Sequence, residues 1–268
     1  MVNETQESTS RQSTAASDGT SGVAVLDRAF AILRAFGAND DRLSLAELSR
    51  RTDLYKSTVL RLLAALEHGG FIRRLSDGQY AIGPQPLRLA ALYQRSFQVG
   101  PVIEPILQQL SRDLGETASL YIRQESLRLV LFRVEPARAV RVSIRVGEEF
   151  PIDRGASGKV LLAFTEKDDP RWQAVREQCW AVSHGERDPE TASVSVPVFG
   201  ATGELIGALA LSGPKARFDM ASTITAALTA LLEAARRATV ALGGASDRFD
   251  IAIKKAATEG FPGIADLA

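Results

Sequence analysis

The chain has 268 residues, enough for two modest domains, and its 45% hydrophobic and 24% charged residues are typical of an ordinary globular protein. Its 32 basic residues balance 32 acidic ones, which excludes a basic protein that coats nucleic acid indiscriminately but allows a local basic surface. The single cysteine excludes an internal disulfide, and the sequence shows neither a secretory signal nor an apolar run of the about 18 residues that a membrane span needs, so we expect a cytoplasmic protein without membrane contact.

The folded part of the chain is expected to begin near Val23. Residues 1–22 are rich in Ser, Thr, Gln and Glu and hold almost nothing to bury, so they predict a disordered tail. A first helix that ends near Gly37 is predicted by apolar residues at the i, i+3, i+4, i+7 spacing of one helix face: Leu26, Ala29, Phe30 and Leu33.

Two further helices follow. Ser44 and Glu47 predict a capping box, in which the serine hydroxyl accepts an amide hydrogen bond while the glutamate reaches back, at the start of a helix over residues 45–51. Asp53 suits the tight turn after it, because aspartate tolerates the left-handed backbone conformation. A third helix, which ends at Gly69-Gly70, is predicted to bury the face made by Val59, Leu62, Leu63 and Leu66.

A predicted β-hairpin completes this region, with strands at 71–75 and 79–82 around an Asp-Gly turn. Three helices followed by a hairpin are the pattern of a winged helix-turn-helix, so residues 23–83 are predicted to bind DNA. The candidate DNA contacts are the polar residues at the start of the third helix and two arginines of the hairpin: Tyr55, Lys56, Ser57, Thr58, Arg61, Arg73 and Arg74.

The same pattern also fits a three-helix domain that binds no DNA. Residues 23–83 hold nine basic and seven acidic residues, which is only a small positive excess. A DNA-independent protein-interaction module with a ligand-sensing domain is therefore the alternative. Salt-sensitive binding to promoter DNA would separate the two hypotheses.

The C-terminal part mixes strands and helices. Pro84 and Pro86 are predicted to break the chain, within a linker at 84–99 that contains a linker helix. Residues 100–243 predict a second domain, with helices at 101–114, 155–164, 170–179 and 219–242 and strands at 117–123, 127–134, 140–146, 180–183, 191–198 and 205–211. This mixture predicts an α+β fold with an antiparallel sheet and flanking helices. Residues 244–268 are predicted to be a C-terminal tail.

Three motifs in this order resemble the IclR family of bacterial transcriptional regulators. They cover Ser44–Leu63, Phe150–Ala163, and Ala192–Phe199 with Gly207–Pro214, and the similarity spans Val23–Gly243. It implies a regulator whose N-terminal domain binds double-stranded operator DNA. It also implies a GAF-like C-terminal domain that binds a small-molecule effector, expected to be an organic or aromatic acid. A homodimer or a homotetramer, as a dimer of dimers, is implied as well.

The resemblance also implies where the effector binds. A carboxylate would be held by backbone amides at the start of the helix that follows Gly155, and by hydroxyl groups of later strands. The positions carried over to this sequence are Ala156 and Ser157 for the amides, and Ser183, Ser193 and Ser212 for the side chains.

This sequence departs from the family pattern at several points. Asp53 and Tyr55 stand where the family usually has Gly and Pro, which changes a local turn. Ser183 replaces an acidic residue and Ala210 replaces a serine, so a less polar pocket is expected. The stretch between Phe164 and Trp180 is shorter than usual, so part of the pocket wall is expected to differ.

No group of residues in the sequence points to an enzyme, a cofactor or a metal. The two histidines, His68 and His184, lie neither in metal-ligand spacing nor beside a nucleophile motif. Gly158-Lys159 is no phosphate loop, because the Ser or Thr that should follow the lysine is absent. Cys179 has apolar and aromatic neighbours and predicts a buried structural thiol. We therefore expect a non-enzymatic protein without cofactor or metal.

Overall fold

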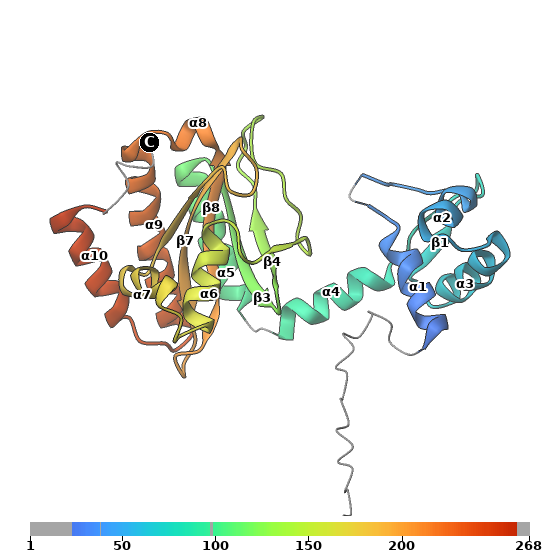
Figure 1. The fold of residues 1–268 in the computed structure, drawn as a ribbon, viewed down its shortest axis with the longest axis horizontal. Helices are drawn as coiled ribbons and strands as arrows, with labels where there is room; N and C mark the ends of the chain where they lie inside the picture. Colours follow the sequence, from blue (N-terminus) through green and yellow to red (C-terminus); the bar gives the residue numbers. More distant parts are fainter. Residues whose placement is uncertain (1–22, 38, 97–98, 262–268) are drawn as a thin grey trace, which may run out of the picture. The chain divides into compact units, whose positions relative to one another are not determined.

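Two units make up the structure, a computed structural model that describes residues 23–37, 39–96 and 99–261 (Figure 1). The first unit runs to Tyr93 and the second begins at Gln94, so the boundary lies inside helix α4 (Gln85–Ser96). The predicted tail at 1–22 lies outside the described residues, as do residues 262–268.

The first unit contains the three helices and the hairpin that the sequence predicts. They are α1 (Ala24–Arg34), α2 (Leu45–Thr52), α3 (Lys56–His68), β1 (Ile72–Arg74) and β2 (Tyr80–Ile82). An apolar cluster holds them together, and Val59 and Leu63 of α3 lie inside it. The face that α1 turns to this core is shifted from the predicted one: Ala29 and Leu33 pack against the core as predicted, Ile32 is fully buried beside them, and Leu26 and Phe30 are exposed.

A side-chain hydrogen bond explains where α2 begins, and a left-handed residue explains where it ends. The Ser44 hydroxyl accepts a hydrogen bond from the Glu47 amide at 3.2 Å, as predicted. The Glu47 carboxylate does not reach back, because it binds Arg50 and Arg51 instead, and these guanidinium groups lower the pKa of Glu47 to about 2. Asp53 ends the helix with φ of +54°, which confirms the left-handed turn expected at this residue.

The hairpin is a short two-stranded wing, and α4 follows it directly. The Leu75 amide donates to the Gln79 carbonyl at 2.8 Å, which closes a tight loop where Gly78 has φ of +81°, a value that glycine adopts without strain. Pro84 precedes α4 and Pro86 lies in its first turn. The predicted chain break is therefore wrong: a proline in the first turn lacks only an amide that no helical hydrogen bond would use.

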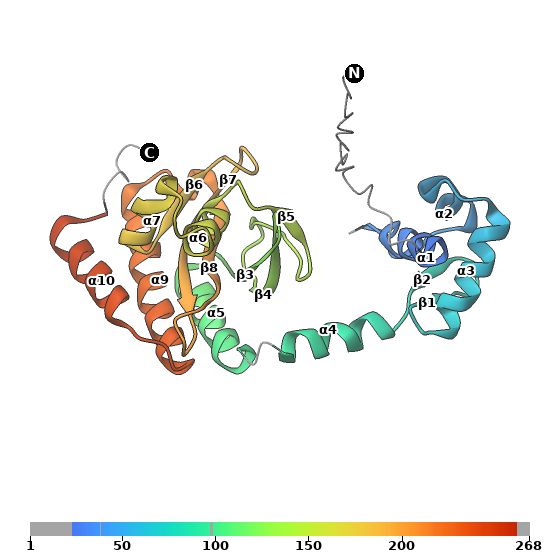
Figure 2. The ribbon, with the colours of Figure 1, turned by 60° about the horizontal axis from the view of Figure 1, so that its bottom comes forward.

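The second unit is built on a six-stranded antiparallel sheet in the order β5-β4-β3-β8-β7-β6. Its strands are β3 (Thr117–Gln124), β4 (Leu127–Val134), β5 (Glu149–Pro151), β6 (Ala181–His184), β7 (Thr191–Phe199) and β8 (Leu205–Pro214). Its helices are α5 (Gly100–Leu114), α6 (Ala156–Thr165), a 3-10 turn (Pro170–Trp172), α7 (Gln173–Gln178), α8 (Lys215–Phe218), α9 (Ala221–Ala241) and α10 (Asp247–Glu259). α5 and α9 pack on each other and on the sheet, and α6 covers β6, β7 and β8 from the other side (Figures 1 and 2).

The two faces of this sheet differ in their side chains, because alternate strand residues point to opposite faces. One face is apolar, with Leu120 opposite Leu209 and Leu209 opposite Val196. The other face carries a row of hydroxyl groups from residues that pair directly across four neighbouring strands: Thr117, Ser212, Ser193 and Ser183. The sheet therefore presents polar side chains on the face that α6 covers.

Residues 140–146, which we call the strap, form no strand although their alternation predicts one. Val142 and Ile144 are buried, as the alternation requires. The strap is held by side chains instead of a neighbouring strand, because the Val142 carbonyl accepts hydrogen bonds from the Thr117 hydroxyl at 3.1 Å and from Arg133. The alternation of apolar and polar residues correctly predicts which strap residues are buried, although the strap forms no hydrogen bonds of a β-sheet.

Where the sequence predicts a C-terminal tail from residue 244, the structure has the 13-residue helix α10. α10 packs on α9, and Phe249 is fully buried, with its ring 6.1 Å from that of Phe199. Phe261, just after the helix, meets the ring of Trp180 edge-on at 5.6 Å. Residues 247–261 therefore belong to the core of the second unit, which corrects the predicted domain limit at 243.

Candidate functional site

A polar surface occupies the N-terminal half of α3. The opposite side of the helix is fixed in the core by Val59, Leu62 and Leu63, so this side is left to face outward. Tyr55 is 86% exposed. The five sequence-predicted residues lie together here, exposed or half-buried: Tyr55, Lys56, Ser57, Thr58 and Arg61.

The wing adds two exposed arginines, Arg73 and Arg74. They are consecutive residues of β1, so their side chains leave opposite faces of the wing. The Arg74 amide donates to the Glu67 carboxylate at 3.2 Å, which ties the wing to the last turns of α3. The wing therefore carries one arginine on each of its faces.

Charge pairing separates this surface from α2 and the loop before it. Arg42, Arg50 and Arg51 each form an ion pair with a carboxylate. Within the described residues, no ion pair involves any of the four basic groups of the candidate surface: Lys56, Arg61, Arg73 and Arg74. An unpaired cation keeps its full attraction for a phosphate group, so this surface suits a nucleic-acid backbone.

The N-terminus of α3 supplies further donors. Tyr55 is the N-cap residue, and its side chain makes no capping hydrogen bond. The turn before it is fixed by the Ser49 hydroxyl, which donates to the Leu54 carbonyl at 2.6 Å. The first amides of this helix therefore lie beside the unpaired cations, at the positive end of the helix dipole, where a phosphate is favoured.

In the second unit, the serines expected to bind an effector meet around one small cavity. Its volume is about 20 Å³, which is room for about one water molecule. Ala156, the fifth predicted residue, is fully buried at the start of α6. The side chains that surround the cavity include Ser157, Ser183, Ser193 and Ser212 together with Tyr121, Arg128, Ile144 and Arg187.

Arg128, which sequence analysis missed, is the buried charge of this cavity. It is 4% exposed, and its Nη1 donates to the Ser157 hydroxyl at 2.5 Å. The guanidinium lies 5.4 Å from the ring centre of Tyr121 and 5.6 Å from that of Phe150. Its Nε has no hydrogen-bond partner.

The guanidinium of Arg128 also has no ion-pair partner within the described part of the chain. Burial lowers its pKa, but an arginine remains charged at neutral pH. The carboxylates of Glu186 and Asp153 lie within electrostatic range of the guanidinium but form no ion pair with it, and a buried cation without a directly paired anion is unfavourable by roughly several kcal/mol in general. The cavity is therefore suited to an anionic ligand.

The N-terminus of α6 adjoins Arg128. Its N-cap, Gly155, has φ of +81°, and a Cβ at this position would lie 2.8 Å from Nη1 of Arg128, so only glycine leaves room for the guanidinium. The Gly155 amide donates to the Glu186 carboxylate at 3.0 Å. The next amides, of Ala156 and Ser157, stand at the positive end of the helix dipole.

Only a weak signal in the sequence could have identified Arg128. It stands between Leu127 and Leu129, the alternation of a strand with one solvent-facing side. In the structure, the Arg128 side chain lies against Gly155 and Ser157 at the start of α6 and near Phe150 of β5. A basic residue on a half-buried strand is therefore buried by other segments, which alternation cannot place.

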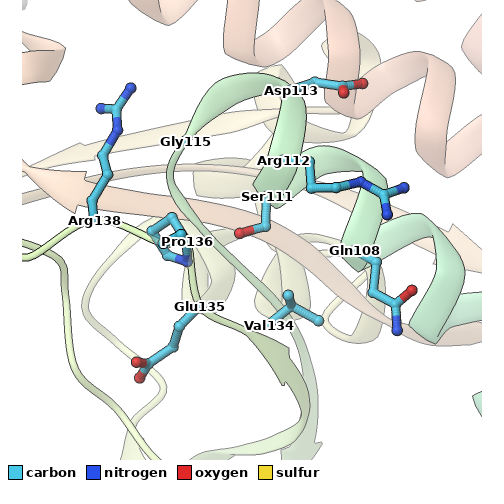
Figure 3. A pocket seen from close by; sticks show the side chains of 10 residues that line it. Gln108, Ser111, Arg112, Asp113, Gly115, Val134, Glu135, Pro136 and Arg138 are labelled. Carbon is cyan, nitrogen blue, oxygen red and sulfur yellow. The ribbon is translucent and has the colours of Figure 1, made fainter.

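A larger cleft of about 500 Å³ lies between the end of α5 and the segment after β4 (Figure 3). Ser111, one of its lining residues, is buried and its hydroxyl has no hydrogen-bond partner. Two charged residues of its rim are already paired: Glu135 with Arg141 at 2.5 Å and Arg138 with Glu116 at 3.4 Å. The cleft lacks the buried unpaired charge that distinguishes the smaller cavity.

Other candidate chemistry is weaker. Cys179 is fully buried, and burial raises the pKa of its thiol to about 11, so the thiol stays protonated at neutral pH, as a structural residue would. Among the described residues, no group of histidine, cysteine and acidic side chains could hold a metal ion. Within the same residues, no helix has the length and apolar character that crossing a membrane requires.

A winged helix-turn-helix with an unpaired basic surface, followed by an α+β unit, defines a helix-turn-helix transcriptional regulator. The family is shown by direct comparison. Residues 25–76 match the IclR helix-turn-helix domain, and residues 91–172 and 169–240 match the bacterial transcriptional regulator IclR C-terminal domain. The chain belongs to the IclR family, and α10 lies beyond the residues that match.

Similar proteins agree with this assignment. The HTH-type transcriptional regulator Rv1719 of Mycobacterium tuberculosis is 39% identical over 145 residues, which cover 53% of this chain and only 54% of that protein. The HTH-type transcriptional regulator BhcR of Paracoccus denitrificans is 28% identical over 245 residues, 82% of this chain and 87% of that protein. An IclR homolog from Microbacterium hydrocarbonoxydans, complexed with 4-hydroxybenzoate, shares the fold with a TM-score of 0.68 at 21% identity, over 81% of this chain and 98% of its own.

Proposed function

We propose that this protein binds operator DNA through α3 and the wing, and that an organic acid bound beside Arg128 controls this binding. Membership of the family and the unpaired cations of the first unit support the DNA-binding part. The effector part is carried by one observation, the buried guanidinium of Arg128 without a carboxylate partner among the described residues. The homolog complexed with 4-hydroxybenzoate is consistent with an acid as effector.

A carboxylate beside Arg128 would compensate each unfavourable feature of the cavity. It would pair the guanidinium charge and accept a hydrogen bond from Nε, which has no partner. The Ser157 hydroxyl and the amides at the start of α6 would donate to its other lone pairs. The hydroxyl row on the sheet offers Ser183, Ser193 and Ser212 to the rest of the ligand.

Arg61→Ala is expected to lower operator affinity by about 1–3 kcal/mol. Arg61 is exposed and unpaired on α3, so the proposed function has its side chain contact a DNA base, and alanine removes that contact. The measurement is a fluorescence-anisotropy titration of labelled upstream DNA at several salt concentrations. Arg50→Ala is the matched control, because Arg50 lies on α2 and pairs with Glu47. Absence of salt-sensitive DNA binding by the unmodified protein would favour the protein-interaction module instead.

A second copy of the chain is expected to pair with this one through α4. Leu87 is 76% and Leu92 is 60% exposed on this helix, and a dimer on a two-fold axis would read a palindromic site. Light scattering at micromolar concentration should give the mass of a dimer or a tetramer. The double variant Leu87→Glu with Leu92→Glu should shift that mass downward, and a monomer in the unmodified protein would contradict the proposal.

A further inference from the structure

Two buried arginines lie on the same face of β4, although they are five residues apart. In a regular strand, residues 128 and 133 would point to opposite faces. The register between β3 and β4 contains a shift, a β-bulge, and a bulge moves the alternation on by one residue. Arg128 therefore pairs with Arg123, and Arg133 pairs with Ser119, which belong to one face of β3.

Tyr121 stands between the two guanidinium groups. The partners of the two arginines on β3 are four residues apart, so the Cα atoms of Arg128 and Arg133 are about 13 Å apart, at roughly 3.3 Å per residue. Tyr121 lies midway on the same face, and its phenol is within electrostatic range of both guanidinium groups. The two cations thus flank one aromatic side chain.

Arg133 resembles Arg128 in its burial and in its unused donors. Its side chain is 4% exposed, and its Nη1 has no hydrogen-bond partner. The hydroxyl of Ser119, directly opposite on β3, has none either. Glu135 contacts the guanidinium of Arg133 at 3.3 Å but also pairs with Arg141 at 2.5 Å, so two cations share this carboxylate, and the Glu148 carboxylate is within electrostatic range of Arg133 without pairing with it.

We propose that the effector is a dicarboxylate, with one carboxylate on Arg128, the other on Arg133, and its middle against Tyr121. The inference rests on the proposed function, because it extends the site at Arg128 along β3 and β4 to Arg133, which is not among the residues that line the small cavity. Two carboxylates give acceptors to Nε of Arg128, Nη1 of Arg133 and the Ser119 hydroxyl. A monocarboxylate accepts hydrogen bonds from only one of the two arginines. The donors at the other arginine stay unsatisfied, and buried unsatisfied donors are unfavourable in free energy.

The strap lies beside this site, because its Val142 carbonyl accepts hydrogen bonds from Arg133 and Thr117 and its Ile144 lines the cavity next to Arg128. A cavity of about 20 Å³ is smaller than any dicarboxylate, so the strap moves away from the sheet when the ligand enters. Arg133 donates to the Val142 carbonyl of the strap. A ligand carboxylate replaces this carbonyl as the acceptor from Arg133. Binding of the second carboxylate to Arg133 and release of the strap therefore occur together.

The test is isothermal titration of the full chain with pairs of acids that share a carbon skeleton: succinate and butyrate, adipate and hexanoate, terephthalate and benzoate. In at least one pair, the dicarboxylate should bind about tenfold or more tightly, as an added charge-assisted contact implies. Arg133→Gln should bring the dicarboxylate to the affinity of its monocarboxylate. Arg171→Gln, which removes an arginine that is 73% exposed and pairs with Asp169, is the control.

Arg133→Gln could lose affinity simply because it misfolds, so a second variant that is expected to gain affinity is also tested. Glu135→Gln removes the carboxylate that competes for Arg133, so it should tighten dicarboxylate binding several-fold and leave monocarboxylate binding unchanged. Equal affinities within every pair, or a preference that survives in Arg133→Gln, would overturn the dicarboxylate inference while leaving the proposed function intact. Failure of all six acids to bind would overturn the inference, and acid binding that survives in Arg128→Gln would overturn the role proposed for Arg128.

Discussion

Replacing Arg128 by glutamine is expected to abolish the response of DNA binding to acidic effectors and, at the same time, to stabilise the ligand-free protein. The buried guanidinium has no carboxylate partner among the described residues and an unsatisfied Nε, so its removal relieves an unfavourable charge by about 1–3 kcal/mol. The loss of a charge-assisted carboxylate contact should cost about 2–5 kcal/mol of effector binding, roughly 30-fold or more in affinity.

Both effects can be measured without interference from the first unit. The two tryptophans, Trp172 and Trp180, lie in the second unit, so urea unfolding followed by tryptophan fluorescence reports on that unit alone. Release of labelled operator DNA by an acid gives the effector response. An Arg128→Gln protein that is less stable than the unmodified chain and still releases DNA would show that Arg128 is structural; Arg171→Gln should change neither property.

The opposite signs of these effects express a general property of binding sites. A site that keeps a charge unpaired until its ligand arrives is destabilised in the free state, and the ligand then restores what the fold lacks. Linkage makes this reciprocal: an acid that weakens DNA binding tenfold binds about tenfold more weakly to the DNA complex, roughly 1.4 kcal/mol. If the proposed function holds, Arg128 is the group through which a bound acid would contribute most to this coupling.

Local signals in the sequence were enough to predict the first unit. Helical periodicity, the Ser44 cap and the Asp53 turn act over a few residues, and the structure confirms all three. The exception is part of α1, where Ile32 is buried beside Ala29 and Leu33 of the predicted face while Leu26 and Phe30 are exposed. The amides of Ala156 and Ser157 and the side chains of Ser183, Ser193 and Ser212 were predicted by resemblance alone.

The cavity beside Arg128 was only partly predictable because it depends on contacts between separate segments. Arg128 is buried against the start of α6 and Phe150 of β5, and Arg133 joins it on one face of β4 through a bulge that no residue type marks. The strap itself shows strand alternation, but its Val142 carbonyl binds side chains. Periodicity reveals which side chains turn inward and leaves open what covers them.

α10 was missed for a different reason. Its inward face follows helical spacing at Phe249, Ala252, Ile253 and Ala256, but two of these four residues are alanines, so the apolar signal is weak. Phe249 and Ala252 are buried, and Ile253 and Ala256 pack against the core. Arg248 also lies over the rings of Phe199 and Phe164, at 5.1 and 5.5 Å.

Phe249→Ala is accordingly expected to destabilise the second unit by about 3–5 kcal/mol, because Phe249 is fully buried and its loss leaves a cavity against Phe199. Ile251→Ala on the same helix is the matched control: Ile251 is 66% exposed, so its replacement should change stability by no more than about 0.5 kcal/mol. Urea unfolding followed by tryptophan fluorescence measures both variants, and Trp180, which packs on Phe261 after α10, reports from close by. Equal stabilities of the two variants would mean that α10 lies loosely on the core, and the predicted tail would then be the better description of residues 247–261.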